Sequence, residues 1–256
     1  MMTRFVKVSL AILALAALAW ASDPWKSKPY QQWDQKDINQ ILNHSPWVQI
    51  VHVPIGSDMD LSAPSMGGQP MGAPTGQTTA SGRPGMGGGQ SGMGGGQPGM
   101  GGGPVQAAPE TFFEARWVSA LTMRQAIARI SELQGKVSQA AVEHYLAETP
   151  ADYEIAVVGP DMSLFVHEQE AELAKASFLD AKESRMKVAP DKVTIGRSPD
   201  GKTVTSVEFD FPRTVNGKPV IGPKEKQIEF ACKTKRRTLQ FHFDPRKMTT
   251  KQGPDL

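Results

Sequence analysis

The sequence predicts an α+β fold, with an antiparallel β-sheet covered on one face by helices and a long disordered Gly/Met-rich insert. Three observations carry this prediction. Three segments within residues 119–181 have apolar side chains at helical spacing, and residues 207–211, 228–232 and 239–243 alternate apolar with polar side chains. Residues 56–109 offer few apolar side chains that could be buried. Helical spacing indicates amphipathic helices, and alternation indicates strands with one dry and one wet face.

The first 21 residues are typical of a signal peptide. A positively charged start, a mostly apolar run and a small-x-small cleavage pattern follow one another: Arg4 and Lys7, Val8 to Leu18, and Ala19-Trp20-Ala21. We therefore expect an exported protein, periplasmic or extracellular, with a mature chain that begins near Ser22. The apolar run is shorter than the about 20 residues of a membrane span. No stable transmembrane segment is expected after cleavage, and an uncleaved anchor is the alternative.

A short helix is predicted to begin after Asp34. This residue suits an N-cap, Asp37 is favourably placed in the first turn, and Ser45-Pro46 ends the helix. Its apolar stripe consists of Ile38, Ile41 and Leu42. Two segments rich in β-branched and aromatic residues follow, at residues 47–53 and 111–118. We expect them to pair as antiparallel strands, because closing the longer loop between them adds only about 2 kcal/mol.

The insert between these strands, residues 56–109, is predicted to be a disordered linker. It holds 18 of the 25 glycines and no aromatic residue. Ordering its backbone would cost on the order of 50–100 kcal/mol. Burying its six methionines would return only roughly 10–20 kcal/mol. The larger entropy term favours a flexible chain.

Three of these methionines, Met86, Met93 and Met100, recur in a seven-residue repeat and are called the repeat methionines below. Thioethers suit Cu(I), so copper binding by the insert is one hypothesis. An inert spacer is the alternative, because no His or Cys lies between them.

Beyond the insert, helices are predicted at residues 119–133, 138–147 and 163–181, the first two as a helical hairpin, with a strand at residues 153–158. Turn signals at residues 199–202 and 216–217 then separate the strands of an antiparallel sheet. Nine side chains are expected on its dry face: Val207, Phe209, Phe211, Ile228, Phe230, Cys232, Leu239, Phe241 and Phe243. The helices at residues 120–147 and 163–181 are expected to cover this face.

These elements divide the chain into a signal peptide (1–21), a helix-rich α/β part (22–55 and 110–181), the linker (56–109) and an antiparallel β part (182–256). Residues 110–181 carry 5 Lys or Arg and 12 Asp or Glu, a net charge of −7, whereas residues 182–256 carry 17 and 9, a net charge of +8. Opposite fields favour docking of the β part on the preceding helices. Two independently solvated surfaces are the alternative.

A basic turn, defined by Lys233, Lys235, Arg236 and Arg237, is a candidate for binding an anionic surface such as lipid headgroups or a polyanionic glycan. A solvated β-turn is the alternative. Nucleic acid is not expected as the partner of an exported protein.

Local motifs of catalysis are absent from the sequence. There is no G-x-S-x-G elbow and no phosphate loop. Ala171 stands where a helical zinc motif starting at His167 would need its second histidine. Cys232 is expected in the core, where a thiol is inert. We therefore expect no cofactor.

Two stretches resemble the start and the end of a family of uncharacterised exported bacterial proteins. At the start the pattern is Trp33, Asp37, Ile41-Leu42-Asn43 and Ser45-Pro46-Trp47. At the end it is Phe211-Pro212-Arg213, Gly217-Lys218-Pro219, Glu225-Lys226, Glu229-Phe230 and Phe243-Asp244-Pro245-Arg246-Lys247-Met248. The resemblance covers about 40–50 residues and implies no activity, cofactor or catalytic residue.

The leading hypothesis is an exported non-enzymatic protein, a binding or envelope-interaction module whose partner is an unknown protein or envelope component. The alternatives are copper handling through the repeat methionines and a hydrolase whose site is assembled only by the fold.

Overall fold

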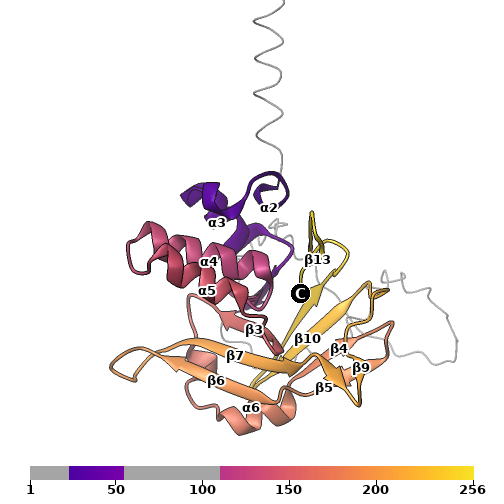
Figure 1. Cartoon of the computed structure of the whole chain (residues 1–256). Helices are drawn as coiled ribbons and strands as arrows, with labels where there is room; N and C mark the ends of the chain where they lie inside the picture. The colour runs from indigo at the N-terminus through magenta and orange to yellow at the C-terminus, as the bar shows by residue number, and fades with distance from the viewer. Residues whose placement is uncertain (1–22, 55–109) are drawn as a thin grey trace, which may run out of the picture. The chain divides into compact units, whose positions relative to one another are not determined.

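The computed structural model describes residues 23–54 and 110–256 (Figure 1). The predicted signal peptide and the predicted linker, including the repeat methionines, lie outside the described residues. Within the described part, helices and antiparallel sheets occur together, which confirms the α+β class. Across these same residues, no helix combines the length and the apolar character that a membrane crossing requires.

The described helices and strands follow one another in the order of the chain. The helices are α2 (Pro24–Ser27), α3 (Gln35–His44), α4 (Leu121–Leu133), α5 (Gln139–Ala147) and α6 (Glu170–Ala176), with two 3-10 turns, η1 (Tyr30–Gln32) and η2 (Ser163–Phe165). The strands are β1 (Val48–Pro54), β2 (Glu110–Trp117), β3 (Asp152–Val158), β4 (Phe178–Ala181), β5 (Met186–Val188), β6 (Lys192–Arg197), β7 (Val204–Pro212), β8 (Thr214–Val215), β9 (Lys218–Pro219), β10 (Ile228–Lys233), β11 (Thr238–Phe243), β12 (Thr249–Thr250) and β13 (Gly253–Pro254).

A five-stranded antiparallel sheet has the strand order β1-β2-β3-β7-β6. Its first two strands are the segments on either side of the insert. Val48 lies opposite Arg116, and Val53 lies opposite Thr111. The predicted pairing of these segments is therefore confirmed, and β1 joins a sheet whose other four strands all come after the insert.

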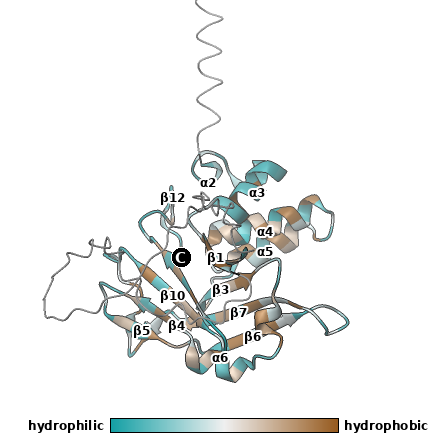
Figure 2. Cartoon of the chain, turned by 180° about the vertical axis from the view of Figure 1, so that it is seen from behind, coloured by the Kyte–Doolittle hydropathy of each residue, from teal (hydrophilic) through white to brown (hydrophobic). Residues whose placement is uncertain are grey.

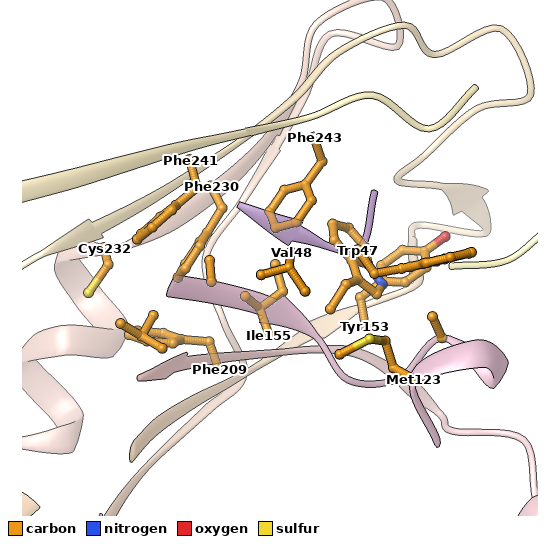
Figure 3. Packing of buried hydrophobic residues seen from close by; sticks show 14 of the residues in the cluster. Trp47, Val48, Met123, Tyr153, Ile155, Phe209, Phe230, Cys232, Phe241 and Phe243 are labelled. Carbon is orange, nitrogen blue, oxygen red and sulfur yellow. The ribbon is translucent and has the colours of Figure 1, made fainter. Parts of the chain in front are cut away.

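A four-stranded antiparallel sheet has the order β11-β10-β4-β5 and faces the first sheet. All nine side chains predicted for the dry face are buried. The structure differs in what covers them, because β7 belongs to the first sheet whereas β10 and β11 belong to the second. Phe209 of β7 packs on Phe230 of β10, with ring centroids 5.1 Å apart (Figure 3). Phe211 of β7 packs on the same ring at 5.8 Å. The second sheet thus supplies much of the cover that the sequence assigns to helices.

The sequence also predicts a single helix over residues 163–181, and this prediction is wrong. The segment forms η2, then α6, and then strand β4. Leu179 and Ala181 are buried and lie opposite Phe230 and Ile228 of β10. Pairing with a strand about fifty residues later overrides the local helical pattern, since burial and ladder hydrogen bonds outweigh propensity. Helix α6 lies against β6 and β10.

The helices α3, α4 and α5 pack together beside the sheets (Figure 1). The N-cap predicted at Asp34 is confirmed, with Asp34 and Asp37 forming a reciprocal capping box. The helical hairpin of α4 and α5 is also confirmed. Its apolar faces are only partly covered, since Leu133 and Tyr145 remain 48% and 41% exposed.

One apolar cluster runs through the described residues. It extends from Trp25 and Trp33 near the start to Phe243 and Met248 near the end. Trp117 packs edge-on against Phe243 at 5.2 Å and so connects the two sheets. The N-terminal segment is therefore fixed by the same core as the β-sheets.

Candidate functional site

The N-terminal cleft is a hollow of about 340 Å³ at the junction of three parts of the chain. Its walls come from α2 with the loop that leads to η1, from the start of α4, and from the turn between β12 and β13. Figures 1 and 2 show the β12–β13 hairpin beside α2 from opposite sides. The volume is near the lower end of the range of about 300–1,000 Å³ that is usual for small-ligand sites.

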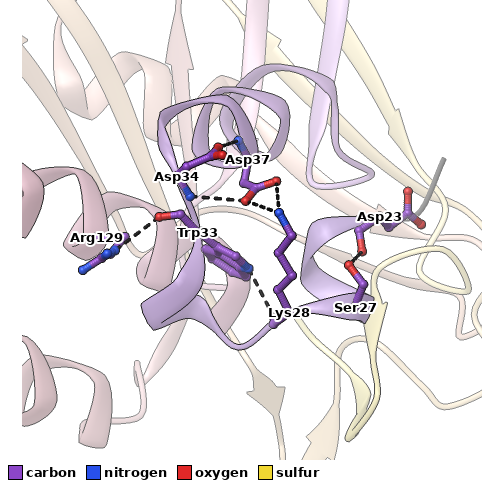
Figure 4. A network of polar contacts seen from close by, with 7 residues as sticks. All are labelled: Asp23, Ser27, Lys28, Trp33, Asp34, Asp37 and Arg129. Carbon is purple, nitrogen blue, oxygen red and sulfur yellow. Dashed lines mark hydrogen bonds and ion pairs between the residues drawn. The ribbon is translucent and has the colours of Figure 1, made fainter. Parts of the chain in front are cut away.

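A polar network holds the N-terminal wall of this cleft in place (Figure 4). The indole Nε1 of Trp33 donates to the carbonyl of Lys28 at 3.3 Å, and Lys28 Nζ reaches the Asp37 carboxylate at 2.8 and 3.1 Å. Arg129 of α4 donates to the carbonyl of Trp33 at 3.3 Å. The hydrogen bond from Lys28 to Asp37 raises the pKa of Lys28. The loop between α2 and α3 is therefore tied to both α3 and α4.

Asp255 fixes the wall that α4 contributes. The N-cap residue of α4, Ala120, has no side chain that could cap the helix. The Asp255 carboxylate instead accepts hydrogen bonds from the backbone N–H groups of Leu121 at 2.6 Å and Thr122 at 2.9 Å. Its backbone carbonyl accepts the indole N–H of Trp47 at 2.7 Å. The chain beyond β13 thus joins the start of α4 to the aromatic core.

The aromatic side chains at the cleft differ in accessibility. Trp25 and Trp33 are 7% and 2% exposed, so they act mainly as support. Trp25 packs edge-on against buried Trp47 at 5.5 Å, and Tyr30 packs edge-on against Trp33 at 6.5 Å. Tyr30 is only half-buried, so it is the ring that a bound molecule can reach.

The charged side chains in the described lining of the cleft are three lysines, two of which are paired with carboxylates. Lys26, Lys28 and Lys251 line the cleft, and no Asp or Glu is among the described residues of its lining. Lys26 and Lys28 form ion pairs with Asp23 and Asp37, both at 2.8 Å. Lys251 lies exposed at the tip of the β12–β13 turn and has no polar partner in the described part of the chain.

A second hollow of about 280 Å³ adjoins the first and shares Leu121, Thr250 and Gln252 with it. It contains Arg213, whose guanidinium donates to the carbonyls of Pro150 and Leu256 and lies 4.4 Å above the ring of Tyr153. Its lining also includes Ser119, whose buried hydroxyl has no hydrogen-bond partner among the described residues. The two hollows form a surface that continues across Leu121, which is 42% exposed.

A third hollow, of about 460 Å³, lies between residues 159–166 and residues 202–205. It has no aromatic side chain among its described lining residues. The N-terminal cleft is the better candidate site because it combines a reachable ring, amide groups and an unpaired cation.

The basic turn lies at the β10–β11 connection, and its four cations differ. Lys233, Lys235 and Arg236 are exposed, whereas Arg237 is 8% exposed and its guanidinium lies 3.4 Å from the carbonyl oxygen of Pro54. The backbone of the turn is fixed, because the N–H of Lys235 donates to the buried carboxylate of Glu168 at 3.0 Å. Three of the four predicted anion-binding side chains therefore share an open surface.

The other chemical candidates lie apart from the cleft. Cys232 is fully buried, and burial raises the pKa of its thiol, as the prediction of an inert core cysteine requires. His167 is exposed, in the segment between η2 and α6. In the residues that the structure describes, no group of three or more His, Cys, Asp or Glu side chains is arranged to hold a metal ion. The repeat methionines lie outside the described residues.

The cleft itself was not predictable from the sequence. The sequence predicts an extended segment over residues 22–30, which is wrong at Pro24–Ser27, where the structure forms helix α2. The only local signal of a site is the spacing of Trp25, Tyr30 and Trp33. This spacing does not indicate that the segment meets residues 250–252.

Comparison with known proteins adds no relative. No protein family, no curated protein and no solved structure matches this chain.

Proposed function

We propose that this protein is an exported binding module that holds an envelope component in the N-terminal cleft. The observation that carries the proposal is the composition of the cleft. A half-buried ring at Tyr30, an exposed apolar side chain at Leu121 and an unpaired cation at Lys251 converge on one hollow. Concave sites with an apolar surface and a few convergent polar groups are the usual form of ligand sites.

The rigidity of the cleft supports this function. Its N-terminal wall is tied by the Trp33, Lys28 and Asp37 contacts, and its α4 wall is tied by Asp255. A site whose walls are already held loses less conformational entropy when a ligand binds. The export that the signal-peptide pattern predicts makes an envelope component the available partner.

The test is affinity isolation from the solubilised native envelope with the full-length protein and two variants. Leu121→Ser removes an exposed apolar side chain from the cleft, and serine is acceptable at the start of a helix. The matched control is Leu133→Ser, since Leu133 is similarly exposed at the other end of α4 and does not line the cleft. Bound material is analysed for both peptides and glycans by mass spectrometry.

The proposal requires one component that the wild type and Leu133→Ser retain in similar amounts and that Leu121→Ser loses. Equal retention by all three proteins would place binding elsewhere on the molecule. Retention of nothing by the wild type would also count against the proposal.

A further inference from the structure

We propose that the ligand of the N-terminal cleft is an acidic saccharide, that is, a sugar chain bearing carboxylate groups. This inference rests on the proposed function, because it names the ligand class of the same cleft. Three properties of the lining support it: the sign of its charge, the placement of its one accessible ring, and its supply of amide and hydroxyl groups.

The charge of the cleft selects an anion. Lys26 and Lys28 already pair with carboxylates of the chain itself, whereas Lys251 is exposed and unpaired within the described part of the protein. No Asp or Glu is among the described lining residues, and the carboxylates behind the walls are already engaged: Asp23 and Asp37 by lysines, and Asp255 by the backbone N–H groups of Leu121 and Thr122. A ligand carboxylate can thus pair with Lys251 without displacing an existing ion pair.

The accessible ring selects a flat, weakly polar surface on the same ligand. Tyr30 is half-buried, and its orientation is supported by the edge-on contact with Trp33. Trp33 is in turn held by the hydrogen bond from its indole to the carbonyl of Lys28 (Figure 4). The C–H face of a pyranose ring is apolar and packs on an aromatic side chain, while its hydroxyl groups point outward to polar partners.

The remaining lining provides those partners. Amide side chains come from Gln31, Gln125 and Gln252. The hydroxyl groups of Ser27 and Thr250 donate to the Asp23 carbonyl and the Gln252 amide oxygen, so they are offered to a ligand as acceptors. Amides both donate and accept, which matches the sugar hydroxyl. An acidic peptide is a poorer fit, since peptide sites depend on an open sheet edge or a groove for a helix. The adjoining hollow beyond Leu121 leaves room for a chain longer than one sugar ring, and its lining carries both signs of charge, Arg124 and Arg213 together with Glu148 and Asp255.

The experiment is a calorimetric titration of the full-length protein with tetragalacturonate and with its methyl ester. The ester keeps the rings and the length of the probe but removes its charge. Lys251→Gln is compared with Lys136→Gln, which removes another exposed cation outside the cleft. Tyr30→Ala is compared with Tyr145→Ala, which removes an exposed ring on α5.

We expect the wild type to bind the acid more tightly than the ester. Lys251→Gln should weaken binding of the acid by roughly fivefold and leave the ester unchanged, as expected for one exposed charge pair. Tyr30→Ala should weaken binding of both probes by about tenfold, because it removes ring contact that both share. The two control variants should bind like the wild type.

Equal affinity for acid and ester, or no effect of Lys251→Gln, would overturn the acidic-saccharide proposal. If the cleft instead retains a peptide or a neutral glycan from the envelope, the ligand class is wrong while the binding function stands. If the acid binds equally well to all cleft variants, both proposals fail, because the site lies elsewhere.

Discussion

Replacing Asp255 tests how the cleft is built, because one carboxylate caps α4 from 134 positions away in the sequence. The change to alanine removes the acceptor of two backbone N–H groups, those of Leu121 and Thr122. The backbone carbonyl of residue 255, which accepts the hydrogen bond from the Trp47 indole, is unaffected by this change. The variant therefore isolates the cap from the rest of the contact.

The magnitude follows from two contributions. Loss of an N-cap costs about 1 kcal/mol, with a range of roughly 0.5–2. Loss of a partly buried negative charge at a helix N-terminus costs about another 1 kcal/mol. Asp255→Ala should therefore lower the free energy of unfolding by about 2 kcal/mol. Asp255→Asn keeps an acceptor oxygen and loses only the charge, so about 1 kcal/mol is expected.

Urea unfolding followed by circular dichroism measures these differences. With a slope of about 2 kcal/mol per M, the midpoint of Asp255→Ala should fall by about 1 M. Glu143→Ala is the control, since this carboxylate is exposed on α5, and its effect should stay within about 0.5 kcal/mol. A midpoint for Asp255→Ala that equals that of the control would refute the reasoning.

Three further predictions concern charge and metal binding. Burial, together with the charge of Asp210 directly opposite on β7, raises the pKa of Glu154. A carboxyl whose pKa is raised in the folded state destabilises the fold at neutral pH. This cost disappears as the pH falls below the pKa of the same carboxyl in the unfolded chain. Glu154→Gln should thus raise the free energy of unfolding by about 0.5 kcal/mol at pH 7 and leave it unchanged near pH 3. A series of thermal melts in which the variant is less stable than the wild type at pH 7 would contradict this. Replacing the three exposed cations of the basic turn by glutamine should weaken binding to anionic vesicles on the order of 100-fold, at about 1 kcal/mol per cation. Binding is measured by co-sedimentation, and the urea midpoint should not change. Unchanged binding would mean that the turn is only solvated. Leucine at the repeat methionines should abolish Cu(I) binding in a competition titration if the insert handles copper, and an unaltered stoichiometry would exclude that hypothesis.

Local pattern was sufficient for much of the fold. The apolar alternation around Phe209, Phe230 and Phe241 predicted buried strand faces, and all three side chains are buried. The β-branched and aromatic segments on either side of the insert predicted the β1–β2 pair. The capping pattern at Asp34 predicted the start of α3. In each case the residues that decide the structure are close in sequence or form a regular pattern of apolar and polar side chains.

Failures occurred where distant contacts decide the outcome. Alternation of apolar and polar residues shows which face of a strand is dry but not what covers that face. The sequence therefore did not predict that the strands divide between two sheets. Residues 178–181 form a strand because they pair with β10, which their own helical spacing could not reveal. The candidate site depends on Leu121 and Lys251 meeting the N-terminal segment. The cap at Asp255, which joins the chain beyond β13 to the start of α4, has no local signature.

Photocrosslinking from within the cleft tests the central claim most directly. A photoreactive benzoylphenylalanine is placed at Leu121 in one full-length protein and at Leu133 in another, and both are irradiated in the native envelope. The two positions are similarly exposed on the same helix, and only the first lines the cleft. The binding function predicts a defined crosslinked product from position 121 that is absent from position 133. The same products from both positions, or a product from position 133 alone, would contradict the assignment of the cleft as the binding site.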